Sequence, residues 1–153
     1  MDQGLNKTFL RQTEEIFSLR EADSRIYSGL PLAFIGDCVF ELTIRTLVLS
    51  KGSMPVQKLT RRCQEIVKAP SQAAMIRAII GDLTEEEQAV VRRGKNSSPS
   101  SKAKNASTED YLWATGYESL IGWLYLENRQ ERLLEIIKAG LETSQEGRKL
   151  LGM

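Results

Sequence analysis

Residues 32–42 read LAFIGDCVFEL, an almost wholly apolar stretch that nevertheless contains the carboxylates Asp37 and Glu41. The same combination recurs in YLWATGYESLIGWLYL, residues 111–126, where Glu118 is the only charged residue. A helix that is apolar on nearly every side is covered by neighbours on several sides. Both stretches are therefore predicted to be central helices of one domain, each with an acid that is costly to bury.

The rest of the chain also favours helices, and we expect one all-α domain of about seven helices. Hydrophobic residues make up 41% of the 153 residues and charged residues 27%, a balance typical of a globular domain. Residues 95–106 are expected to form a loop, and the tail after Gly147 is expected to fray. The expected helices are two short ones within 7–27, then 31–50, 55–69, 71–80, one from the Thr84 capping box to Gly94, 107–125, and one capped by Asn128 that includes Leu141.

The residues that are missing exclude several classes of chemistry. The chain has no histidine and two cysteines, Cys38 and Cys63. A structural zinc site needs about four Cys or His ligands, and Ser–His–Asp or Cys–His catalysis needs an imidazole. Two cysteines outside a CxxC motif fit a reducing compartment better than a disulfide framework. Any chemistry must then depend on carboxylates, hydroxyls and a hard metal ion.

No segment is predicted to enter or cross a membrane. The opening MDQGLNKTFLRQTEE lacks the basic and apolar regions of a signal peptide. The most apolar stretch, 30–49, is interrupted by Asp37, Glu41 and Arg45, which would be expensive in lipid. We therefore expect a cytoplasmic protein without a membrane partner.

The acids in the two apolar helices have different expected roles. Glu41 lies four residues before Arg45, at the spacing of a helical ion pair, and is expected to pair with it. Asp37 and Glu118 have no such neighbour, which leaves two interpretations: an ion pair with a distant arginine, or a metal or catalytic site. Oxygen ligands without histidine favour Mg²⁺ or Mn²⁺.

Glycines flank both unpaired acids. Gly36 precedes Asp37, and Gly122 lies one turn after Glu118. Because glycine lacks a Cβ, it lets another helix or a substrate backbone approach closely. We therefore expect close packing beside the two acids.

Basic residues are concentrated in one segment. Residues 92–106, RRGKNSSPSSKAKNA, contain five of the 21 basic residues and no acidic one, which leaves 16 basic against 20 acidic residues elsewhere. A basic segment on an acidic background is typical of a polyanion contact. A solvated loop is the other interpretation, and composition alone leaves both open.

Several of these motifs resemble one enzyme family. LAFIGDCVFEL resembles the signature helix of the ribonuclease III catalytic domain, and YESLIGWLYL (117–126) resembles its second acidic motif. RRGKN (92–96), the pair Lys104–Asn105 and KAPSQA (68–73) are similar to the Mini-III branch, which is a bare ribonuclease III domain. The resemblance covers residues 28–142.

The resemblance implies an all-α homodimer that cleaves double-stranded RNA with Mg²⁺, or with Mn²⁺ in its place. It also implies that the protein matures the 23S ribosomal RNA precursor, with a ribosomal protein as a further candidate partner. It implies an N-terminal helical extension at 1–27, a catalytic domain at 28–146 and a C-terminal tail at 147–153. Asp37 and Glu118 would be the catalytic and metal-binding residues, and Thr115 would orient a water or a ligand. The implied RNA-binding residues are Arg92, Arg93, Lys95, Asn96, Lys102, Lys104 and Asn105.

Two positions depart from the full-length ribonuclease III pattern. Ala33 and Thr115 stand where those enzymes carry further acids, which matches the Mini-III branch but leaves fewer metal ligands. This departure motivates a rival hypothesis, a non-catalytic RNA-binding ribosome assembly factor with a degenerate site. A helical interaction module without an RNA partner is a third.

Overall fold

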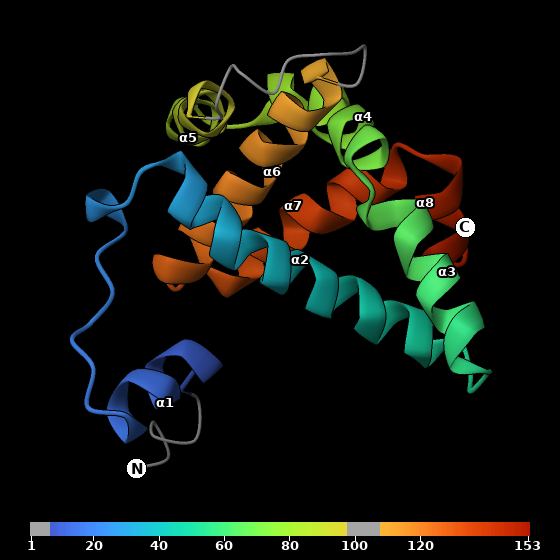
Figure 1. The fold of residues 1–153 in the computed structure, drawn as a ribbon, viewed down its shortest axis with the longest axis horizontal. Helices are drawn as coiled ribbons and strands as arrows, with labels where there is room; N and C mark the ends of the chain where they lie inside the picture. The colour runs from blue at the N-terminus through green and yellow to red at the C-terminus, as the bar shows by residue number, and fades with distance from the viewer. Residues whose placement is uncertain (1–6, 98–107) are drawn as a thin grey trace.

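The computed structural model describes residues 7–97 and 108–153, and within them the chain forms eight α-helices and no strand. The prediction of an all-α domain is confirmed. Two long helices, α2 (Gly29–Ser50) and α6 (Thr108–Leu126), cross in the middle of the molecule, and the shorter helices surround them (Figure 1).

The remaining helices follow the chain around this central pair. α4 and α5 both pack on α6, and α3 packs on α2. The bounds are α1 Phe9–Ile16, α3 Val56–Val67, α4 Ala69–Ile79, α5 Glu85–Asn96, α7 Gln130–Glu142 and α8 Gln145–Leu150, with short 3-10 helices at Ser24–Ile26 and Ile80–Asp82.

The core lies where α2 and α6 cross. Phe40 and Tyr117 contact each other across it with ring centroids 5.6 Å apart, and both are almost completely buried. The Tyr117 hydroxyl donates to the Ile136 carbonyl on α7 at 3.2 Å, so the buried phenol is satisfied. This packing makes α6 a rigid support for the residues on it.

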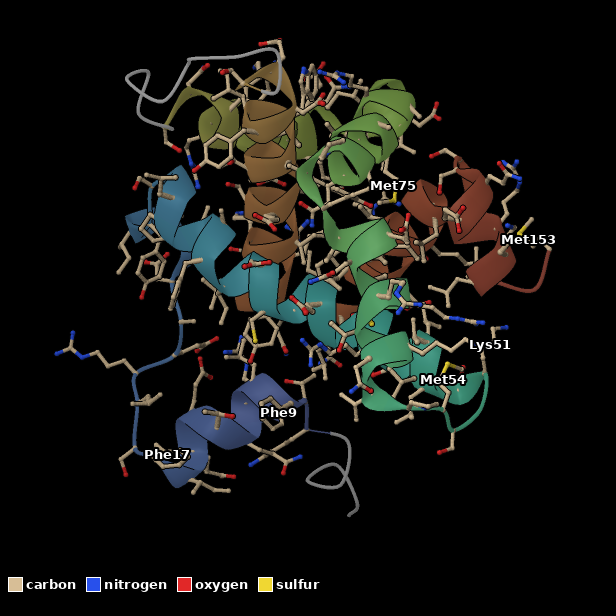
Figure 2. All side chains as sticks on the ribbon, turned by 45° about the vertical axis from the view of Figure 1, so that its right-hand side comes forward. Phe9, Phe17, Lys51, Met54, Met75 and Met153 are labelled. Atoms are coloured by element: carbon tan, nitrogen blue, oxygen red, sulfur yellow. The ribbon has the colours of Figure 1, made fainter. Side chains whose placement is uncertain are left out.

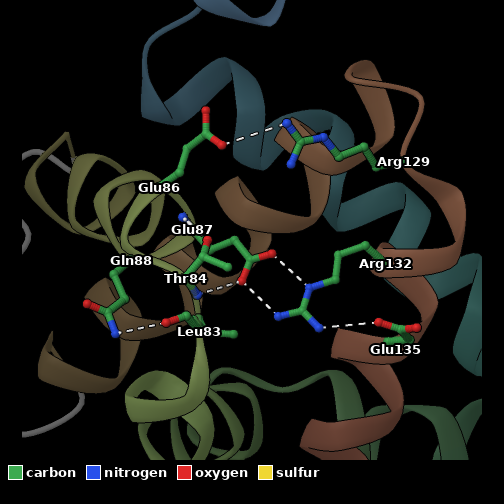
Figure 3. Close-up of polar contacts among 8 residues, drawn as sticks. All are labelled: Leu83, Thr84, Glu86, Glu87, Gln88, Arg129, Arg132 and Glu135. Carbon is green, nitrogen blue, oxygen red and sulfur yellow. Dashed lines mark hydrogen bonds and ion pairs between the residues drawn. The ribbon is translucent and has the colours of Figure 1, made fainter.

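A partly buried ion pair joins the start of α5 to α7. Thr84 and Glu87 form the predicted capping box, in which the Glu87 carboxylate accepts from the Thr84 backbone N–H at 2.9 Å. Arg132 donates to both oxygens of the same carboxylate at 2.8 and 2.9 Å (Figure 3). The guanidinium of Arg132 and the N–H of Thr84 hold the pKa of Glu87 below its ordinary value despite burial.

Some boundaries differ from the expected ones. α2 begins at Gly29 rather than Pro31, because a proline in the first turn needs no hydrogen-bonded N–H. The prediction that Asn128 caps α7 is wrong: Asn128 has a left-handed φ of 61°, and Arg129 occupies the cap position. The expected fraying after Gly147 is also wrong, because Ser144 caps α8 by accepting from the Gly147 N–H at 2.9 Å.

The N-terminal segment is joined to the body at a few points. Leu10 is buried, and the Thr8 hydroxyl donates to the Asn128 side chain at 2.6 Å. Phe9 and Phe17 remain exposed on α1 and just after it (Figure 2). The two short helices predicted within 7–27 are α1 and the 3-10 helix Ser24–Ile26. Among the described helices, none is long and apolar enough to cross a membrane.

Candidate active site

Two glycines let the central helices touch backbone to backbone. A Cβ added at Gly36 on α2 would overlap the carbonyl oxygen of Glu118 on α6, and one added at Gly122 would overlap the carbonyl of Leu32. The close packing expected beside the acids is therefore present. It places Asp37, which follows Gly36, next to Glu118.

The two acids lie in unequal surroundings. Asp37 is exposed, whereas Glu118 is half-buried. Burial, reinforced by the neighbouring Asp37 carboxylate, raises the pKa of Glu118 from 4.5 to about 8. Near neutral pH, Glu118 therefore holds a proton that an exposed glutamate would have lost.

The ion-pair interpretation fails for these two acids in the described part of the chain. None of the ion pairs in the described residues includes Asp37 or Glu118, because each paired lysine or arginine contacts some other acid. Glu41 pairs with Arg45 at 2.7 Å, as predicted. The Glu41 carboxylate is thus neutralised by an arginine, whereas Asp37, one helical turn before it, and Glu118 have no such partner.

The uncompensated pair fits a hard divalent cation that keeps most of its own water. Within residues 7–97 and 108–153, no group of three or more Asp, Glu, Cys or His side chains is close enough to enclose a metal ion. Mg²⁺ is usually held by one or two carboxylates together with waters and substrate phosphates. Asp37 and Glu118 are sufficient for that mode of binding.

Thr115 lies one turn before Glu118 and is buried. Its hydroxyl donates to the Tyr111 carbonyl at 2.9 Å, so its proton is already used within the helix. The hydroxyl oxygen can still accept a hydrogen bond. Ala33, the other departure from the ribonuclease III pattern, is a buried apolar residue on α2.

Gln72 belongs beside this site, although the sequence does not single it out among the predicted site residues. It lies near the start of α4 and is only 2% exposed, and its Nε2 has no hydrogen-bond partner. Its amide is close enough to Glu118 to lower the pKa of that carboxyl, against the effect of burial. Its only trace in the sequence is its position within KAPSQA.

The basic residues gather at the end of α5. Arg92, Arg93 and Asn96 are exposed there. Lys95 is half-buried, with its Nζ 3.6 Å from the centroid of the Trp113 ring. The other predicted RNA-binding residues, Lys102, Lys104 and Asn105, lie outside the described residues.

Small residues bring the end of α5 to the start of α2. A Cβ added at Gly29 would lie 2.7 Å from the Cα of Gly94, and the Ser119 hydroxyl donates to the Gly29 carbonyl at 2.8 Å. Asp37 follows Gly29 by eight positions, which corresponds to about 12 Å along the helix axis. The end of α5 therefore lies beside the start of the helix that carries Asp37.

One hollow of the described structure lies away from the acids. It has a volume of about 410 Å³ and is lined by residues at the end of α2 and on α3 and α8, among them Lys51, Arg62 and Glu146. Neither acid lines it. The exposed Asp37 carboxylate leaves its side of the candidate site open to solvent.

Comparisons with known proteins agree with this arrangement. Residues 30–129 match the family model described as "Ribonuclease III domain". The chain is 45% identical to a Mini-ribonuclease 3 of Clostridium tetani, covering 81% of this chain and 83% of the relative, and 37% identical to one of a Thermoanaerobacter species, covering 93% and 94%. A crystal structure of a Fusobacterium nucleatum protein superposes with a TM-score of 0.69 at 34% identity, covering 80% of this chain and 98% of that one.

Proposed function

Because this chain belongs to the ribonuclease III family, in its Mini-ribonuclease 3 group, and is an endoribonuclease, we propose that it hydrolyses double-stranded RNA with Mg²⁺ at Asp37 and Glu118. The family acts on double-stranded RNA. One observation carries the assignment of the site: two carboxylates without a paired cation meet at a glycine-mediated helix crossing.

The residues present suit phosphodiester hydrolysis without an imidazole. When bound, Mg²⁺ would stabilise charge on the scissile phosphate and lower the pKa of a bound water. Glu118 would release the proton that burial makes it retain in the metal-free protein, and Asp37 would present its exposed carboxylate to the same ion. Thr115 would accept a hydrogen bond from a water or ligand and so orient it. Mn²⁺ would serve in the same way.

RNA would be held from the α5 side. Arg92, Arg93 and Asn96 are exposed and would contact phosphates and sugars, and we assign the same role to Lys102, Lys104 and Asn105. Lys95 would contribute from its place over Trp113. Double-stranded RNA presents phosphates at regular intervals and hides its base edges in a deep groove, so charge and shape would dominate recognition.

The enzyme would act as a homodimer. Several large apolar side chains of α2 are exposed on one stripe of the helix, a pattern that favours a protein contact. A second copy with the same stripe would cover it and would place two active centres across one duplex. The exposed residues are Leu30, Phe34, Leu42 and Leu49, of which Phe34 is 81% exposed.

In the cell, we propose that the protein matures the 23S ribosomal RNA precursor in the cytoplasm, where a ribosomal protein could present the RNA. Two free cysteines fit a reducing compartment. Residues 28–146 would form the catalytic domain, with 1–27 and 147–153 as additions to it. A non-catalytic assembly factor is the alternative, but a pair of uncompensated acids has no use in such a protein.

One incubation separates these possibilities. Purified protein is mixed with a structured RNA duplex and with a single strand of the same sequence, with and without Mg²⁺. Discrete fragments from the duplex, formed only with Mg²⁺, are the expected result. A shift of the duplex on a native gel without cleavage would favour the assembly factor, and neither cleavage nor shift would favour an interaction module.

A further inference from the structure

The Gln72 amide lacks a structural explanation in the free protein. Buried polar groups are almost always hydrogen-bonded, because an unpaired buried donor costs stability. Gln72 Nε2 nevertheless has no partner, although the side chain is only 2% exposed. A leucine of similar size would fill the same space without that cost.

Local structure fixes where this amide lies. Pro70 stands in the first turn of α4, and the Ser71 hydroxyl donates to the Glu65 carbonyl at the end of α3 at 2.7 Å. These features define the start of α4, whose body packs on α6. The amide of Gln72 thereby reaches the Glu118 carboxyl rather than solvent.

The donor and the acid are matched in chemistry. A carboxylate that ligates a metal ion keeps lone pairs that can accept from an N–H, and metal-ligating carboxylates are commonly held by such a bond. An amide N–H kept dry and unpaired beside the acid is available for that purpose.

We propose that Gln72 is a positioning residue of the active site, whose Nε2–H donates to the Glu118 carboxylate in the metal-bound enzyme and fixes its orientation. This inference rests on the proposed function, because it takes Glu118 as a metal ligand. Gln72 would act through Glu118 and not on the scissile phosphate itself.

Gln72→Leu tests the proposal, and Gln88→Leu is its matched control. Gln88 is also a glutamine at the start of a helix, but its Nε2 donates to the carbonyls of Ile80 and Leu83 at 2.9 and 3.2 Å (Figure 3 draws the second bond). Its role is structural. Mg²⁺ affinity is measured by calorimetry on the full chain, thermal stability by circular dichroism, and kcat and KM on one RNA duplex.

Gln72→Leu should weaken Mg²⁺ binding by about tenfold and lower kcat by a similar factor, with KM for RNA and thermal stability unchanged. Gln88→Leu should lose stability and keep the Mg²⁺ affinity of the wild type. A Gln72→Leu protein with wild-type affinity and kcat, or one whose losses follow a loss of stability, would overturn the proposal. Glu118→Gln separates a failure of the Gln72 inference from a failure of the proposed function. If this variant binds Mg²⁺ as tightly as the wild type, Glu118 is not a metal ligand and both fail.

Discussion

Gly36 on α2 lies so close to the backbone of Glu118 on α6 that a Cβ at position 36 would overlap the Glu118 carbonyl oxygen. This backbone contact brings the two acid-bearing helices together. The atoms that a Cβ at Gly36 would meet are backbone atoms of α6, so no flexible side chain can move aside.

Gly36→Ala should therefore destabilise the protein by about 3 kcal/mol or more, because one extra methyl group forces the two central helices apart. Cleavage should be lost even in the fraction that stays folded. Gly81→Ala is the control, since a Cβ there meets nothing within 4 Å. Chemical denaturation measures both; equal stability of the two variants would show that the crossing is loosely packed.

The second prediction concerns pH. Burial, reinforced by Asp37, raises the pKa of Glu118 from 4.5 to about 8. Between these two pH values the folded metal-free protein keeps the Glu118 proton, whereas the unfolded chain has released it. The free energy of unfolding should therefore fall as pH rises through this interval and level off above it. Glu118→Gln should remove that decline and be about 1–3 kcal/mol more stable than the wild type at pH 8 without metal.

Denaturant titrations from pH 5 to pH 9, with and without Mg²⁺, measure this effect. Bound Mg²⁺ should flatten the wild-type curve, because it favours the ionised carboxylate. If Glu118→Gln is less stable than the wild type at pH 8, the acid has a structural partner and the metal assignment is wrong.

The third prediction concerns the grip on RNA. Replacing Arg92 and Arg93 with alanine should weaken duplex binding and lower the slope of log K against log salt by up to about two, because each arginine that neutralises a phosphate releases a counterion. The rate at saturating RNA should change little. Arg61 and Arg62 on α3, also adjacent and exposed, provide the matched control. An equal effect of both double variants would show that RNA binding is not centred on α5.

The fourth prediction concerns assembly. Phe34→Glu should convert a dimer to a monomer at micromolar concentration, because a charge in the middle of an apolar stripe cannot be buried without a partner. Phe9→Glu, which changes a side chain that is 74% exposed on α1, should leave the dimer intact. Sedimentation gives the mass of each; a monomeric wild type that still cleaves both strands would contradict the proposal.

Local features of the fold could be predicted from the sequence. The Glu41–Arg45 pair and the cap at Thr84 depend on residues three or four positions apart, so spacing along one helix was enough. The prediction of a helix cap at Asn128 is wrong because asparagine is common both at helix caps and at left-handed turn positions. Composition could not distinguish these two uses.

The candidate site depended on contacts between distant segments. Asp37 and Glu118 could be marked as costly acids in apolar helices, but their proximity follows from the glycine crossing. Gln72 was beyond prediction from residue pattern, because an amide near the start of a helix is ordinary until tertiary packing buries it. That its Nε2 lacks a hydrogen-bond partner can be seen only in the folded structure.

The central claim is that Asp37 and Glu118 perform the chemistry without holding the fold together. The most direct measurement compares cleavage of one RNA duplex in Mg²⁺ by Asp37→Asn, Glu118→Gln and Glu41→Gln, with the thermal stability of each. The first two should lose about 10³-fold or more in rate while staying folded, and Glu41→Gln, whose acid is paired with Arg45, should cleave within a few-fold of the wild type. Folded Asp37→Asn or Glu118→Gln protein that cleaves at the wild-type rate would contradict the account.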